Sequence, residues 1–86
     1  MSGELQLRVH VLDVWDEVRL DLPAVTTISA LKAEALGLAN VPDDPAEYLV
    51  KFRGAELSDE SRSLADAKVP NDAGLIVMRR RRVPVR

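Results

Sequence analysis

Side chains that could carry out covalent or metal chemistry are few in this 86-residue chain. There is no cysteine, which excludes disulfides, thiolate metal sites and thiol nucleophiles together. His10 is the only histidine, and no nucleophile stands near it in the sequence. The acidic pairs at 43–44 and 59–60 suit loops and caps, and the isolated glycines form no phosphate-cradling loop. We therefore expect no enzyme activity, no metal site and no cofactor.

The arginines are concentrated at one end of the chain. Residues 79–86 hold five arginines and no acid, so of 12 bases only seven remain to face 14 acids in residues 1–78, a net charge of −7. This basic end suits a protein contact, a solubilising terminus or a phosphate-binding handle. The acidic body and the single Phe, Tyr and Trp disfavour a nucleic-acid platform. We rank protein binding first, the solubilising end second and nucleic acid third.

Length and composition predict one small soluble domain. The chain is 47% hydrophobic and 30% charged, which is normal for a globular protein. No window of about 18 apolar residues occurs, and Glu4 and Arg8 interrupt any apolar start. We expect no membrane insertion, no signal peptide, a cytoplasmic location and a monomer in isolation.

Hydrophobic periodicity places five strands and one helix. Alternation with period two predicts strands at 5–12, 18–22, 48–53 and 74–79, with a short strand around 56–57. A hairpin loop of about three to five residues should join the first two strands. Between residues 26 and 40 the period becomes helical, with Thr27 as the N-cap and Asn40 as a left-handed C-cap.

The order β-β-α-β-β-β predicts an α+β domain of two layers, in which one helix covers one mixed sheet. The helix stripe is expected to comprise Ile28, Leu31, Ala35 and Leu38. Leu64 and Val69 should anchor the polar segment between the short strand and the last strand. The expected core residues are Leu5, Leu7, Val9, Val11, Val18, Leu20, Leu22, Ile28, Leu31, Leu38, Val50, Leu64, Leu75 and Val77.

Several segments in this order resemble the ubiquitin family, from about Leu5 to Arg80. "TTISALKAEA" is similar to the family's helix opening, and "NVP" is similar to its helix exit. "FRGAELSDESRSLADAKVPNDAGLIVMR" is similar to the stretch from the third strand to the end of the domain. The resemblance implies a ubiquitin-like β-grasp domain at 1–80, followed by a basic tail at 81–86. It also implies that the first and last strands pair in parallel at the centre of the sheet.

The resemblance also sets expectations about function. Conjugated members of the family end in Gly-Gly, because their terminal carboxylate must enter a narrow enzyme channel. Here no glycine follows Gly74, and the last four residues are Val83, Pro84, Val85 and Arg86. We therefore expect a diverged member that is not conjugated, with a modifier or carrier precursor that requires processing as the alternative. Lys51 stands where the family's recognition surface has its central isoleucine, so readers of ubiquitin itself should bind weakly.

Strand alternation predicts which side chains face away from the helix. The outward-facing residues of neighbouring strands form an apolar strip surrounded by cations. Trp15 falls in the first hairpin turn, where the ubiquitin family carries a leucine used in recognition. The strip is Leu49, Ile76 and Met78. The cations are Arg8, His10 when protonated, Lys51, Arg53, Arg80 and Arg82. An apolar centre with a charged rim is typical of an interface, so we expect a protein-interaction module, such as an adaptor or a small subunit.

Overall fold

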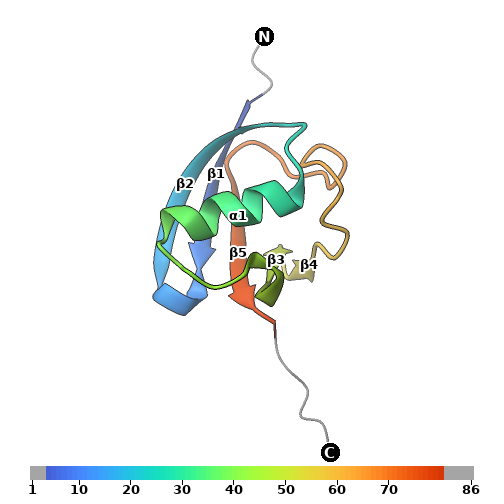
Figure 1. Ribbon diagram of the computed structural model, residues 1–86. Helices are drawn as coiled ribbons and strands as arrows, with labels where there is room; N and C mark the ends of the chain where they lie inside the picture. Colours follow the sequence, from blue (N-terminus) through green and yellow to red (C-terminus); the bar gives the residue numbers. More distant parts are fainter. Residues whose placement is uncertain (1–3, 81–86) are drawn as a thin grey trace, which may run out of the picture.

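The computed structural model describes residues 4–80, with the side chain of Asp13 excepted. The predicted tail at 81–86 lies outside the described residues. Figure 1 shows a single helix, α1, lying across one face of a five-stranded sheet. The two-layer α+β architecture predicted from the sequence is confirmed.

The first hairpin joins β1 (Glu4–Val11) to β2 (Asp16–Pro23), and these strands pair antiparallel along their whole length. The connection is a 3-10 turn, η1 (Leu12–Val14), followed by Trp15 in the left-handed region at φ 53°. The predicted short loop is confirmed, although Leu12 belongs to the turn and not to the strand.

Helix α1 (Ile28–Leu38) begins and ends close to the predicted positions. The hydroxyl oxygen of Thr27 accepts a hydrogen bond from the backbone N–H of Ala30 at 3.1 Å, which satisfies one of the free donors of the first turn. At the other end Ala39 is the C-cap and Asn40 follows it with a φ of 59°. Asn40 therefore adopts the left-handed conformation that ends many helices, one position beyond the cap.

The predicted helix stripe is wrong at its last position. Leu38 is 53% exposed, whereas Leu36 is 2% exposed. From Ile28 the buried positions run i, i+3, i+4, i+7 and i+8, so the stripe turns toward Lys32 and Leu36 and leaves Leu38 on the other side. Leu36 and Leu38 are equally apolar, so the sequence alone does not distinguish them. Packing against the sheet buries Leu36.

The sheet order is β2-β1-β5-β3-β4. Strand β5 (Ala73–Arg79) lies at the centre, parallel to β1 and antiparallel to β3 (Tyr48–Phe52). The central parallel pair is confirmed. Strand β4 (Ala55–Glu56) is short, and the segment before β3 contains a 3-10 turn, η2 (Pro45–Glu47), that the sequence did not predict.

The core fills the interface between α1 and the sheet. Most of the predicted core is buried, including the anchors Leu64 and Val69, while Leu5 and Leu22 are partly buried at its margin. Tyr48 is also fully buried. Every second strand residue points into this core. The residues between them therefore point to the opposite face of the sheet, which the helix leaves open.

Candidate functional site

The sheet register brings the predicted apolar strip together. Leu49 on β3 is the register partner of Met78 on β5, so their side chains lie side by side on the open face. Ile76, two residues earlier on β5, lies between His10 on β1 and Lys51 on β3. Ile76 is 38% exposed, and Leu49 and Met78 are partly exposed. We call Leu49, Ile76 and Met78 the open-face strip.

Charged residues lie on both sides of the strip. The Nε2 atom of His10 lies 3.6 Å from a carboxylate oxygen of Glu17, its register partner on β2. On the other side Lys51 faces Glu56 of β4 in the register. An apolar residue thus stands between two pairs that each join a basic residue and an acid, which is the arrangement of an interface centre and its rim.

Trp15 is the most exposed large hydrophobic side chain among the described residues, at 88%. Its backbone is held in the left-handed region by the turn that joins β1 and β2. Figure 1 shows this turn at the same end of the sheet as the end of β5. Val14 beside it is also exposed. Tryptophan is enriched among the residues that dominate binding energy at interfaces, so a solvent-exposed tryptophan at the margin of the sheet is a candidate anchor.

Arg8 lies on the open face, farther along β1. Its register partners are Arg19 on β2 and Gly74 on β5, and one of its guanidinium nitrogens donates to the backbone oxygen of Asp72 at 3.4 Å. Arg19 was not singled out in the sequence, although the alternation of "VRLDL" places it on the same face as Arg8.

Comparison with solved structures identifies the fold. The ubiquitin-like domain of an Arabidopsis thaliana protein matches with a TM-score of 0.76 at 17% identity, over 96% of this chain and 84% of that one. Ubiquitin of Caldiarchaeum subterraneum matches with a TM-score of 0.77 at 13% identity, over 95% and 100%. A designed protein based on ubiquitin matches with a TM-score of 0.79 at 19% identity, over 98% of each chain.

The chain has the ubiquitin-like β-grasp fold. No protein-family profile and no curated protein matches the sequence. At these identities the likeness carries the ubiquitin-like fold, and the function must be argued from the chain's own residues.

One predicted member of the open face is placed elsewhere. The sequence pattern extended the third strand to Arg53, but β3 ends at Phe52. Arg53 and Gly54 have φ values of 55° and 81° and form a two-residue turn to Ala55, as expected for a tight hairpin. The guanidinium of Arg53 lies 5.1 Å from the centre of the Phe52 ring. In this ubiquitin-like domain Arg53 is therefore a turn residue stacked on an aromatic ring.

Arg80 is engaged by the domain itself. Its guanidinium contacts Glu56 at 3.4 Å and Glu60 at 3.3 Å, and its Nε donates to the backbone oxygen of Ala46 at 3.1 Å. The preceding Arg79 pairs with Asp43 and Glu47 and stacks on Tyr48.

The two arginines fasten the end of β5 to the body of the domain. Arg82, the next residue predicted on the open face, lies outside the described residues.

The sequence pattern missed a buried cation. Lys32 is 2% exposed, and its ammonium group donates to the backbone oxygen of Tyr48 at 2.9 Å and to a carboxylate oxygen of Glu60 at 2.7 Å. The signal was available, because Lys32 follows Ile28 by four residues and shares its helix face. Because the Lys32 ammonium and the Glu60 carboxylate pair with each other inside the domain, this ion pair is structural.

A hollow lies beside the loop after β4, and its lining includes Glu56, Asp59 and Lys68. The pKa of Asp59 in this loop is held below its usual range, because its carboxylate accepts hydrogen bonds from the hydroxyl and the backbone N–H of Ser61, with Arg62 adding attraction. This stabilisation of the loop is present at neutral pH and is lost as the pH falls through that lowered pKa.

Neither a metal site nor a membrane span is found in the part of the chain that the structure describes. Residues 4–80 contain no group of three or more His, Asp or Glu side chains arranged to hold a metal ion. Within the same range, no helix has the length and apolar character needed to cross a bilayer.

Proposed function

We propose that this domain is a non-enzymatic protein-interaction module that binds a partner protein through its open sheet face. One observation carries the proposal: Ile76 is exposed at the centre of the sheet, with Leu49 and Met78 beside it. Isolated surface leucines are common, but three neighbouring aliphatic side chains on one sheet face form a patch. Such a patch is stabilised when a partner removes it from water.

The surroundings of the strip support a protein partner. Glu17, Lys51 and Glu56 supply charges of both signs around an apolar centre, and the imidazole of His10 adds a polar group, which suits a polar rim. The exposed Trp15 supplies a large anchor at the end of the sheet. We propose that Trp15 and the open-face strip contact the same partner.

We further propose that the chain is not itself conjugated to other proteins. Arg79 and Arg80 tie the end of β5 to the body through ion pairs, and the backbone N–H of Arg80 donates to the oxygen of Glu47 at 2.8 Å. To enter an activating enzyme, the segment after β5 would have to extend away from the domain. These ion pairs and this hydrogen bond oppose that extension. The domain then acts as an adaptor or a small subunit in the cytoplasm.

The proposal is tested by capturing partners from a native lysate with three immobilised forms of the domain. The wild type is compared with Ile76→Glu on the open face and with Glu34→Ala on the exposed surface of α1. Mass spectrometry identifies the bound proteins. We expect a protein that the wild type and Glu34→Ala retain and that Ile76→Glu loses.

The opposite pattern would contradict the proposal. If Ile76→Glu retains the partner while Glu34→Ala loses it, the helix side is the binding face. Circular dichroism of each variant shows whether a lost partner reflects a lost contact or a lost fold.

A further inference from the structure

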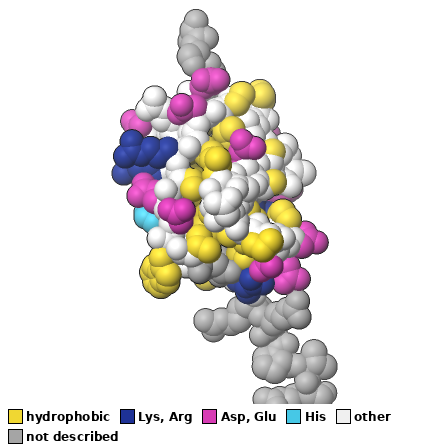
Figure 2. Space-filling view, turned by 60° about the vertical axis from the view of Figure 1, so that its left-hand side comes forward, with side chains coloured by type: hydrophobic (Ala, Val, Ile, Leu, Met, Phe, Trp, Pro, Cys, Tyr) yellow, Lys and Arg dark blue, Asp and Glu magenta, His cyan; other side chains and the backbone are white. Residues whose placement is uncertain are grey.

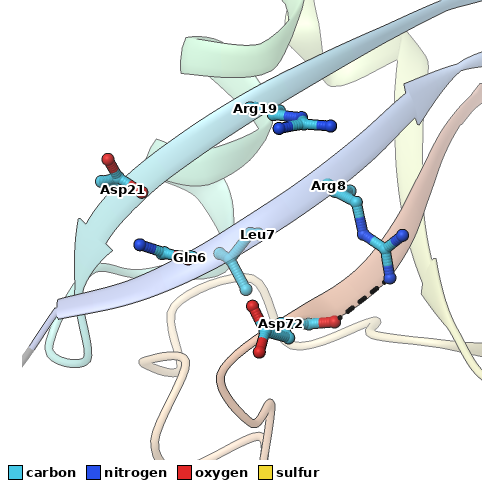
Figure 3. Close-up of a pocket in the computed structure, with 6 residues that line it drawn as sticks. All are labelled: Gln6, Leu7, Arg8, Arg19, Asp21 and Asp72. Carbon is cyan, nitrogen blue, oxygen red and sulfur yellow. Dashed lines mark hydrogen bonds between the residues drawn. The ribbon is translucent and has the colours of Figure 1, made fainter.

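Two arginines face each other across the middle of the first hairpin. Arg8 on β1 and Arg19 on β2 are register partners, and both are exposed. Side chains in this relationship have Cβ atoms about 4.5–5.5 Å apart, and like charges placed so are mutually destabilising. Figure 3 shows both guanidinium groups at the same end of the hollow that they line.

The pair has no counter-ion among the described side chains of residues 4–80, which exclude that of Asp13. No described carboxylate lies within ion-pair distance of either guanidinium, and the hydrogen bond from Arg8 to the backbone oxygen of Asp72 uses one of its five donors. The domain bears a net negative charge, with nine bases and 14 acids in residues 4–80. The two arginines are therefore a local positive site on a domain whose net charge is negative.

The hollow beside the pair is open and divided by charge. It measures about 520 Å³ and is also lined by Gln6, Asp21 and Asp72. In Figure 3 Gln6 and Asp21 lie at the end opposite the arginines, and the carboxylate of Asp72 points away from Arg8. Gly74, the other register partner of Arg8, adds no side chain, and a Cβ there would meet nothing within 4 Å. A ligand therefore has room to reach the arginines from the open face.

We propose that Arg8 and Arg19 bind a carboxylate side chain from an extended acidic segment of the partner protein. This rests on the proposed function, because the same partner would cover the open-face strip. Two guanidinium groups that line one hollow can each donate a charge-assisted hydrogen bond to a carboxylate placed between them. A carboxylate there also removes the repulsion between the two arginines.

The sheet fixes the spacing that the partner must have. Gly74, in the row of Arg8, and Ile76 are two residues apart on β5, which is about 6.6–6.8 Å along a strand. An extended segment lying along the strands also presents its side chains i and i+2 to the same side. The partner segment therefore carries an apolar residue for the strip and an aspartate or glutamate two positions away, with the order of the two set by the direction in which the segment runs.

The acids in the hollow argue against a polyanion as the occupant. Asp21 and Asp72 leave the hollow with no net charge, so a chain of phosphates would meet two carboxylates as well as two arginines. One carboxylate needs only the basic end. Figure 2, which brings the β2 side forward, shows Lys and Arg atoms at the left margin and at the lower edge, with acidic groups close to both.

The test is an NMR titration of the whole 86-residue domain with matched synthetic peptides. The probes are acetyl-Ser-Leu-Ser-Glu-Ser-Ser-amide and the same peptide with glutamine in place of glutamate. Inorganic phosphate and an eight-nucleotide oligothymidine are added separately at equal ionic strength. Amide resonances of Arg8, Arg19 and Gly74 report on the arginine site, and those of Ile76 and Met78 report on the strip.

We expect the glutamate peptide to bind about threefold or more tightly than the glutamine peptide, with the difference shrinking at high salt. The difference should vanish in the double variant Arg8→Gln, Arg19→Gln and persist in Lys68→Gln, which removes an exposed cation lining the other hollow. Because the double variant removes a repulsive pair of exposed side chains, it should remain folded.

Equal affinity for the two peptides overturns the carboxylate site, and if Ile76 and Met78 respond to both, the proposed function stands without it. Tighter binding of phosphate or oligothymidine at Arg8 and Arg19 overturns the peptide assignment. A response confined to Arg8, Arg19 and Gly74 supports the carboxylate site and counts against the open-face strip.

Discussion

The ammonium group of Lys32 lies 2.7 Å from a carboxylate oxygen of Glu60, which joins helix α1 to the loop after β4. Lys32 is buried, while the side chain of Glu60 retains partial exposure and also contacts Arg80. The pair therefore links the helix, the loop and the end of β5. The charge of such a buried cation is neutralised only while its acid is present.

We predict that Glu60→Ala lowers the free energy of unfolding by about 3 kcal/mol or more, because it leaves the charge of Lys32 buried and unpaired. Lys32→Met should cost clearly less, because it removes the buried charge itself and Glu60 keeps Arg80 as a partner. Urea denaturation of both variants measures the two values. A larger loss of stability for Lys32→Met than for Glu60→Ala would show that the cost of burying an unpaired Lys32 charge does not decide the effect of Glu60→Ala.

The leucines at the end of α1 offer a matched test of the packing. Leu36→Ala should lower the free energy of unfolding by about 2–5 kcal/mol, because it opens a cavity in the core. Leu38→Ala removes the same atoms from an exposed position and should change it by no more than about 0.5 kcal/mol. Denaturation midpoints compared at equal slope provide the check. Equal losses would mean that the helix is rotated relative to the sheet.

Much of this fold follows from local pattern. Period-two alternation in β1, β2 and β5 assigns the inward residues, and the apolar strip follows from the same alternation once β3 and β5 pair. The Thr27 cap could be predicted because its hydroxyl bonds within one helical turn.

The differences arise where long-range packing decides. Leu36 and Leu38 are chemically alike, and only the sheet beneath the helix distinguishes them. Arg53 continues an alternating run, yet the turn at Gly54 ends the strand. The ion pairs of Arg80 with Glu56 and Glu60 span 24 and 20 residues, and no periodicity reports contacts at that separation.

The arginine run is expected to be a poor nucleic-acid handle. Duplex or single-stranded DNA or RNA should bind no more tightly than about 10⁻⁴–10⁻⁶ M at physiological salt, the range of non-specific binding. Fluorescence anisotropy with labelled oligonucleotides of several sequences measures the affinity. Submicromolar binding that depends on sequence would place nucleic acid first among the candidate partners.

The chain is also expected to resist C-terminal activation. Incubation with ATP and a ubiquitin-type activating enzyme should yield neither an adenylate nor a thioester, and the intact mass in cells should remain that of the free chain. Mass spectrometry detects each product. A ladder of adducts that disappears when residues 79–86 are deleted would establish the modifier precursor instead.

The most direct measurement of the central claim is the affinity of the captured partner for three variants, determined by calorimetry alongside their unfolding free energies. Ile76→Ala changes a side chain of the open face, so stability should move by about 0.5 kcal/mol at most. Lys51→Glu places an acid opposite Glu56 and should lower stability by no more than about 1 kcal/mol. Binding should weaken by about 1–2 kcal/mol or more, because a central anchor or its charged neighbour is lost. Glu34→Ala on the helix surface should keep full affinity and stability. If the two sheet variants bind as well as the wild type and Glu34→Ala does not, the open sheet face is not the binding site.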